Sequence, residues 1–108
     1  MGFTRYWHRP RVMDAARFGA FADACQEACV ELDGCLAAPT FTEDEVRFDG
    51  SPGCETFLVE RIATRGRGEE PVFEFCKTAH LPYDTAVEQC LRILQEHFPN
   101  EVEIPDPA

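Results

Sequence analysis

The residues with the clearest chemical potential lie between Glu74 and Asp84, in the stretch EFCKTAHLPYD. A thiol and an amine are adjacent at Cys76 and Lys77, and an imidazole follows at His80. Such groups can form an activated nucleophile, because a nearby cation or base lowers the pKa of a thiol. In a strand, however, Cys76 and Lys77 point to opposite faces, and only Glu74 could orient the cysteine from its own face. We therefore expect Cys76 to be a small buried side chain, and we predict no catalytic residue.

The rest of this stretch is typical of a junction between a strand and a helix. Pro82 and Asp84 indicate a helix start, where an acidic residue caps the helix or complements its dipole. Two interpretations remain open: a capped junction in which Lys77 pairs with Asp84 or Glu55, and a small anion or nucleotide pocket at the helix N-terminus. Asp84 counts against the pocket, since its carboxylate would occupy the same N–H donors. The candidate ligand-binding residues of the second interpretation are Glu55, Thr56, Lys77, Thr78, Tyr83 and Asp84.

Six cysteines occur along the chain: Cys25, Cys29, Cys35, Cys54, Cys76 and Cys90. A zinc site usually begins with a tight turn such as C-x2-C, whereas Cys25 and Cys29 lie one helical turn apart on an apolar stripe. The N-terminus has no apolar signal segment, which favours reduced thiols over disulfides. We predict buried, reduced cysteines, no metal and no cofactor.

Two segments have the apolar period of a helix. Between residues 14 and 32, apolar side chains recur at spacings of three and four, with Asp14 as the expected N-cap. A second helical stripe runs from Tyr83 to Phe98. Strands are predicted over residues 3–9, 46–50, 55–62 and 71–77, a loop over 35–45, and a short edge strand over 101–104.

This order of elements is strand, helix, three strands, helix and a short final strand. It predicts an α+β two-layer sandwich, in which a mostly antiparallel sheet of four to five strands carries both helices on one face. The 108 residues are enough for one core and too few for two ordinary domains. We expect a single α+β domain over residues 1–108, with residues 105–108 as a short flexible tail.

The chain is strongly acidic. Twenty acidic residues against ten Lys and Arg give a net charge of −10, and residues 18–60 hold ten acids with Arg47 as their one basic residue. Phosphate neutralisation supplies most nucleic-acid affinity, so this balance argues against a nucleic-acid partner. No apolar run approaches the roughly 20 residues of a membrane span. We expect a cytoplasmic protein.

The N-terminal strand is the predicted interface. Arg5, Tyr6 and Trp7 belong to the residue types that dominate binding hot spots, and Trp7 is the single tryptophan of the chain. One of the two aromatic residues is expected in the core and the other in a surface or subunit contact, because neighbours in a strand face opposite sides. The expected partner is a host or self protein, and a homodimer is one form of such a contact.

Four motifs in order carry a resemblance: YW near the start, FDG, ETF, and FCKTAxxPYDxxV. The chain resembles a family of small uncharacterised proteins encoded by phages, prophages and some bacterial chromosomes. Asp49 departs from the family pattern, in which an asparagine precedes the glycine of FDG, so a role that needs a neutral amide is in doubt here. The resemblance implies a common fold and a common pocket, but it brings no known activity.

These observations favour a small acidic, non-enzymatic interaction protein that is linked to phages or mobile elements and binds a host macromolecule. The acidic region of residues 18–60 could then mimic nucleic acid or block a basic host surface. The alternative is a small-ligand binder or minimal enzyme that uses the junction around Lys77 and Asp84. A zinc-stabilised domain is the third hypothesis.

Overall fold

The protein has two α-helices and five strands in the part of the chain that the structure describes. The computed structural model describes residues 3–50, 55–64, 70–79 and 81–105, and only the backbone of residues 33–35. The elements in chain order are β1 (Thr4–Arg9), α1 (Ala15–Ala28), the 3-10 helix η1 (Val30–Cys35), β2 (Leu36–Phe41), β3 (Glu45–Gly50), β4 (Phe57–Glu60), β5 (Val72–Lys77) and α2 (Asp84–His97). The predicted α+β class is confirmed.

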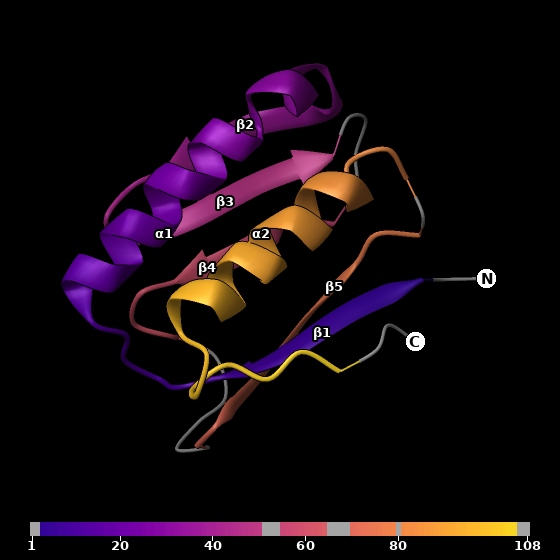
Figure 1. Ribbon diagram of the computed structural model, residues 1–108. Coiled ribbons are helices and arrows are strands. Elements are labelled where there is room, and N and C mark those ends of the chain that lie inside the picture. Colours follow the sequence, from indigo (N-terminus) through magenta and orange to yellow (C-terminus); the bar gives the residue numbers. More distant parts are fainter. Residues whose placement is uncertain (1–2, 51–54, 65–69, 80, 106–108) are drawn as a thin grey trace.

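The strands form two antiparallel sheets instead of the single sheet predicted. One sheet has the order β2-β3-β4 and the other pairs β1 with β5. A bridge between Val12 and Ile62 joins them, with hydrogen bonds from Met13 N to Arg61 O (3.0 Å) and from Ala63 N to Arg11 O (2.8 Å). Both helices lie on the same side of the strands, so the molecule has a helix layer and a strand layer (Figure 1).

The predicted loop over residues 35–45 was wrong, because it contains β2. This strand pairs with β3 but shifts register between Ala37 and Thr40, where Ala38 has a φ of 49°. The irregularity accommodates Pro39, since an edge strand with a bulge does not need every N–H in its ladder. β2 buries only Leu36, so its sequence carries little of the alternation by which strands are recognised.

The predicted edge strand over residues 101–104 is reduced to one bridge. His8 N donates to Glu103 O (2.8 Å) and Glu103 N donates to His8 O (3.0 Å), so this segment pairs with the edge of β1 that β5 leaves free. Ile104 packs against the core. Of the predicted tail, residues 106–108 lie outside the described residues.

The two helices begin near the predicted positions. The carboxylate of Asp14 accepts a hydrogen bond from Arg17 N (2.9 Å), as an N-cap does. α1 ends earlier than expected, at Ala28, because the chain tightens into η1, where Leu32 N donates to Cys29 O (3.0 Å). α2 begins at Asp84, which is an acidic residue of its first turn. Neither helix has the length and apolar character that crossing a membrane requires, within the described residues.

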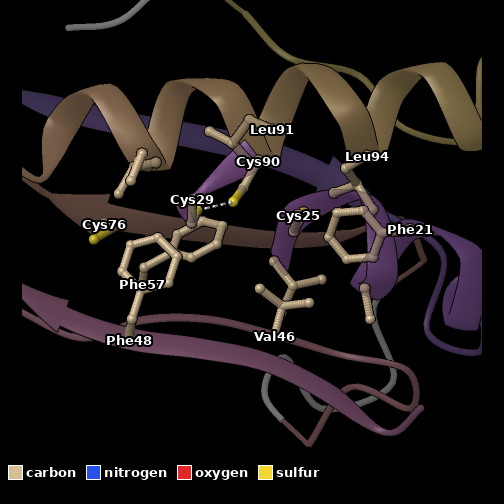
Figure 2. Close-up of a cluster of buried hydrophobic side chains, with 14 of the residues drawn as sticks. Phe21, Cys25, Cys29, Val46, Phe48, Phe57, Cys76, Cys90, Leu91 and Leu94 are labelled. Carbon is tan, nitrogen blue, oxygen red and sulfur yellow. Dashed lines mark hydrogen bonds between the residues drawn. The ribbon is translucent and has the colours of Figure 1, made fainter. Parts of the chain in front are cut away.

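The core lies between the helix layer and the strand layer (Figure 2). Phe57 packs against Phe48 and Trp7, with ring centroids 5.0 Å and 5.5 Å apart. Trp7 is only 1% exposed, so its assignment to an interface was wrong. Strand alternation turns its indole toward the helices, where it contributes to the core instead of to the surface.

β1 and β5 each contribute one residue to a charged pair that is buried on the inner face of their sheet. Arg9 is fully buried and Glu74 is 3% exposed, with Arg9 NH1 3.7 Å from Glu74 Oε1. Trp7 Nε1 donates to the same carboxylate oxygen (3.1 Å). Burial lowers the pKa of Arg9, because the interior disfavours its charge, while the nearby carboxylate of Glu74 acts in the opposite direction. This group ties β1 to β5 on the inner face of their sheet.

Candidate functional site

The carboxylate of Asp84 is the centre of the junction between β5 and α2. Arg5 binds it in a bidentate arrangement, with Nε 2.7 Å from Oδ1 and NH2 2.8 Å from Oδ2. The hydroxyl of Thr78 donates to Oδ1 (2.5 Å). The hydrogen bond to Asp84 raises the pKa of Arg5. The cation that pairs with Asp84 is therefore Arg5 of β1, where the sequence had suggested Lys77.

The hydroxyl of Tyr83 forms a second part of the junction. It lies 2.8 Å from Glu55 O and 3.1 Å from Lys77 O and donates to these carbonyls. The carboxylate of Glu55 accepts a hydrogen bond from Lys77 N (2.8 Å), so Glu55 binds the backbone of Lys77. Thr56 donates to the carboxylate of Asp49. Together these contacts attach the start of β4 to the end of β5.

Five of the six predicted ligand-binding residues bond to one another, and the sixth, Thr56, bonds to Asp49. Tyr83 and Thr78 are buried, with 1% and 0% exposure, and their hydroxyls donate hydrogen bonds to neighbouring groups. Lys77 is exposed on the strand face opposite Cys76, as the alternation of β5 predicted. These contacts agree with a structural junction, although α2 has Tyr83 as its N-cap residue without a side-chain capping bond, and the predicted pairing of Lys77 with Asp84 is replaced by that of Arg5. The small-ligand pocket stays a prediction.

Cys76 lies at the same junction. It is fully buried, with its sulfur 3.7 Å from the hydroxyl of Tyr83 and 3.8 Å from Glu55 O and Thr56 O. His80, the base considered for it, lies outside the described residues. Within the part of the chain that is described, no group of three or more His, Cys, Asp and Glu side chains could hold a metal ion.

A different surface stands out on the outer side of the β1–β5 sheet. Register pairs Tyr6 with Phe75 and His8 with Phe73, and cross-strand partners of an antiparallel pair share a face. The ring of Phe73 lies 5.9 Å from that of Tyr6, 5.3 Å from that of His8 and 6.1 Å from that of Phe75. We call these four residues, Tyr6, His8, Phe73 and Phe75, the outer aromatic face.

The outer aromatic face is open to solvent at its two phenylalanines. Phe73 is 45% exposed and Phe75 is 43% exposed, although Phe is among the residues most often buried. The cross-strand rule also assigns Glu103 to this face beside His8, and Thr4 and Lys77 to its other end. The face therefore combines exposed aromatic rings with one acidic and one basic side chain at its margins.

The acidic residues of the region 18–60 lie on other elements. Asp23, Glu27 and Glu31 are exposed at intervals of four residues along α1 and into η1. Glu43 and Asp44 are exposed at the turn between β2 and β3. The acidic charge of this region is thus spread over α1, η1, the turn between β2 and β3, and the strands β3 and β4, which hold Glu45, Asp49 and Glu60.

The sequence predicted an interface on β1 and did not single out the exposed phenylalanines of β5. Of the three predicted residues, Tyr6 belongs to the outer aromatic face, Trp7 is in the core, and Arg5 is engaged by Asp84. The sequence did contain an indication of the exposed phenylalanines, because strand alternation placed Phe73, Phe75 and Lys77 on one face of the strand. That pattern alone does not tell which side faces solvent, and composition would assign the phenylalanines to the core.

No family model, curated protein or solved structure matches the chain.

Proposed function

We propose that this protein is a small acidic, non-enzymatic binding protein that docks a protein partner on its outer aromatic face. The observation that carries the proposal is the exposure of Phe73 (45%) and Phe75 (43%) next to Tyr6. Contiguous apolar patches on a protein surface mark interaction sites, and aromatic rings dominate the energy of such contacts. The rings stand on paired strands, so the face is rigid before the partner arrives, which lowers the entropic cost of binding.

The junction supports a structural role better than catalysis. Its hydroxyl, carboxylate and guanidinium groups bond to one another, as Arg5 with Asp84 and Tyr83 with Glu55 O show. A substrate would have to displace these bonds before it could be bound. Their effect in the folded chain is to hold β1, β5 and α2 together, and this fixes the strands that present the aromatic rings.

The partner is proposed to be a host protein with an apolar contact surface surrounded by basic residues. An apolar surface matches the phenylalanines, and basic residues match a chain of net charge −10. The resemblance to phage and prophage proteins supports a host macromolecule as the target and the cytoplasm as the place of action. A second copy of the chain fits less well, because two molecules of charge −10 repel each other.

Affinity capture from a bacterial host lysate tests the proposal when three forms of the protein are compared. The test variant is Phe73→Ser/Phe75→Ser, and the matched control is Val30→Ser, which removes an apolar side chain that is 68% exposed on η1. We expect a partner to be bound by the wild type and the control but not by the test variant. If the acidic surface contributes, the binding of the partner to the wild type should also weaken as salt is added.

Two outcomes would contradict the proposal. One is a partner that the double variant still binds with wild-type affinity, since the phenylalanines would then not contribute. The other is a wild-type protein that binds no partner but forms a stable dimer through this face, as size-exclusion chromatography with light scattering would show.

A further inference from the structure

Two buried thiols meet where the end of α1 packs against α2. The sulfur atoms of Cys29 and Cys90 are 3.8 Å apart (Figure 2). Cys29 follows the last residue of α1 and is 3% exposed, and Cys90 lies within α2 and is fully buried. Both are free thiols in this structure. Their contact joins residues 61 positions apart in the chain.

A surface pocket leads to one of these thiols. It has a volume of about 280 Å³, and its lining residues are Gln26, Cys29, Val30, Leu36, Pro39 and Phe41. Cys90 does not belong to the lining, so a small reagent in the pocket meets Cys29 first. The lining combines Gln26 with apolar side chains, and the volume is large enough for a molecule as small as hydrogen peroxide.

The neighbouring sulfur atoms differ in their surroundings. The proximity of Cys25 and burial raise the pKa of Cys90 well above the ordinary value, while the contact with Cys29 acts in the opposite direction. The bond to Cys90 and burial likewise raise the pKa of Cys29. Cys76 belongs to a separate group, since its sulfur contacts Tyr83 and carbonyls near the start of β4. Among the four cysteines whose side chains the structure describes, Cys29 is thus the one that combines a pocket with a partner sulfur.

We propose that Cys29 and Cys90 are an oxidisable pair, which a peroxide entering the pocket converts into a disulfide between α1 and α2. In the first step the sulfur of Cys29 attacks one oxygen of hydrogen peroxide, the O–O bond breaks, and Cys29 sulfenic acid and water form. In the second step the sulfur of Cys90 attacks the sulfur of Cys29. The S–O bond breaks, the S–S bond forms, and the hydroxyl leaves as a second water with the proton of Cys90. The two thiols are oxidised and the peroxide is reduced.

The geometry requires a small movement. A disulfide has an S–S distance of about 2.05 Å, so the two sulfurs must approach by roughly 1.8 Å from their present contact. The product would fix the end of α1 to the middle of α2 and restrict the unfolded chain, which is the main way in which a disulfide stabilises a protein. Because a thiolate is the attacking species and both thiols have a raised pKa, the reaction is slow at neutral pH. The pair therefore stays reduced until peroxide is abundant.

Mass spectrometry of the full chain after treatment with millimolar hydrogen peroxide tests the pairing. Digestion after glutamate separates the candidates, because Glu27 and Glu31 place Cys25, Cys29 and Cys35 in different fragments. We expect the fragments that contain Cys29 and Cys90 to be linked, and the link to disappear after reduction. A link from Cys90 to Cys25 would overturn the proposal. So would a folded protein in which Cys29 and Cys90 stay unlinked after the peroxide is consumed.

Variants separate the roles of the two thiols. In Cys90→Ser the reaction should stop at Cys29 sulfenic acid, which a dione reagent traps, and Cys25→Ser should still form the disulfide. Sulfenic acid on Cys25 instead of Cys29 would contradict the order of steps. The melting temperature of the wild type is a second readout, because the disulfide should raise it by roughly 5 °C or more and a reductant should reverse the rise. Circular dichroism of each variant before oxidation confirms that it is folded.

Discussion

Removing the charge of Glu74 should destabilise the protein strongly, because it deprives the buried guanidinium of Arg9 of its main counter-charge, with the weaker contributions of Glu60 and Glu70 remaining. The substitution Glu74→Gln keeps the shape of the side chain and an acceptor for Trp7 Nε1, whose present bond to Glu74 is 3.1 Å long. It removes the negative charge that lies 3.7 Å from Arg9 NH1. Arg9 keeps its bonds to backbone carbonyls, including Pro10 O (2.9 Å) and Arg61 O (3.2 Å).

The size of the effect follows from this distance and from burial. Two unit charges 3.7 Å apart attract each other by about 4 kcal/mol at an effective dielectric constant near 20. Removing one partner of a buried pair typically costs about 3–5 kcal/mol, since the other charge remains desolvated. The carbonyl bonds of Arg9 reduce this penalty, so we expect Glu74→Gln to lower the free energy of unfolding by about 3 kcal/mol. That is a large part of the total stability of a small domain, about 5–15 kcal/mol.

Urea unfolding measures this change, with circular dichroism and the fluorescence of the single tryptophan as two probes. The matched control is Glu103→Gln, an exposed acidic residue, which should change the free energy of unfolding by less than about 0.5 kcal/mol. In an Arg9→Met background, Glu74→Gln should cost less than it does in the wild type, because no buried guanidinium then loses its main counter-charge. A loss below about 1 kcal/mol for Glu74→Gln, or an equal loss in both backgrounds, would refute the assignment of Glu74 as the compensating charge.

Three further predictions concern the junction, the first helix and the thiols. Tyr83→Phe removes the donor to Glu55 O and Lys77 O and should lower the free energy of unfolding by about 1–3 kcal/mol in urea titration; an unchanged midpoint would contradict the role of this hydroxyl. Asp14→Ala removes the N-cap of α1 and should lower stability by about 1 kcal/mol, seen as a fall of about 4–8 °C in melting temperature. Burial and sulfur contacts raise the folded-state pKa of Cys29 and Cys90 above 9.0, so stability present below pH 9.0 should fall as the pH rises further. Unfolding measured above pH 9.0 should show a shallower decline for Cys29→Ala/Cys90→Ala than for the wild type, and parallel declines would count against these shifts.

Much of the fold could be predicted because its elements have strong local signals. The apolar spacing around Phe18 and Phe21, with an N-cap at Asp14, located α1, and alternation located β5 with its two faces. β2 was missed because Pro39 and the neighbouring acidic residues are typical of a loop. Only its pairing with β3 makes that segment a strand.

The candidate site could be predicted less completely, because its key contacts join distant segments. The six junction residues were identified from the helix start, but the pairing of Arg5 with Asp84 spans 79 positions and leaves no local pattern. The burial of Trp7 and the exposure of Phe73 depend on which face of the β1–β5 sheet the helices cover. A strand pattern fixes two faces, whereas the packing of the helix layer decides which of them is the core.

The most direct test of the proposed function is hydrogen–deuterium exchange of the protein with its captured partner bound. Docking on the outer aromatic face predicts slower amide exchange in β1 and β5, centred on Phe73 and Phe75, with exchange along the exposed side of α1 unchanged. Protection confined to the acidic residues of α1, with β5 exchanging as it does in the free protein, would contradict the proposal and would place the partner on the helix layer instead.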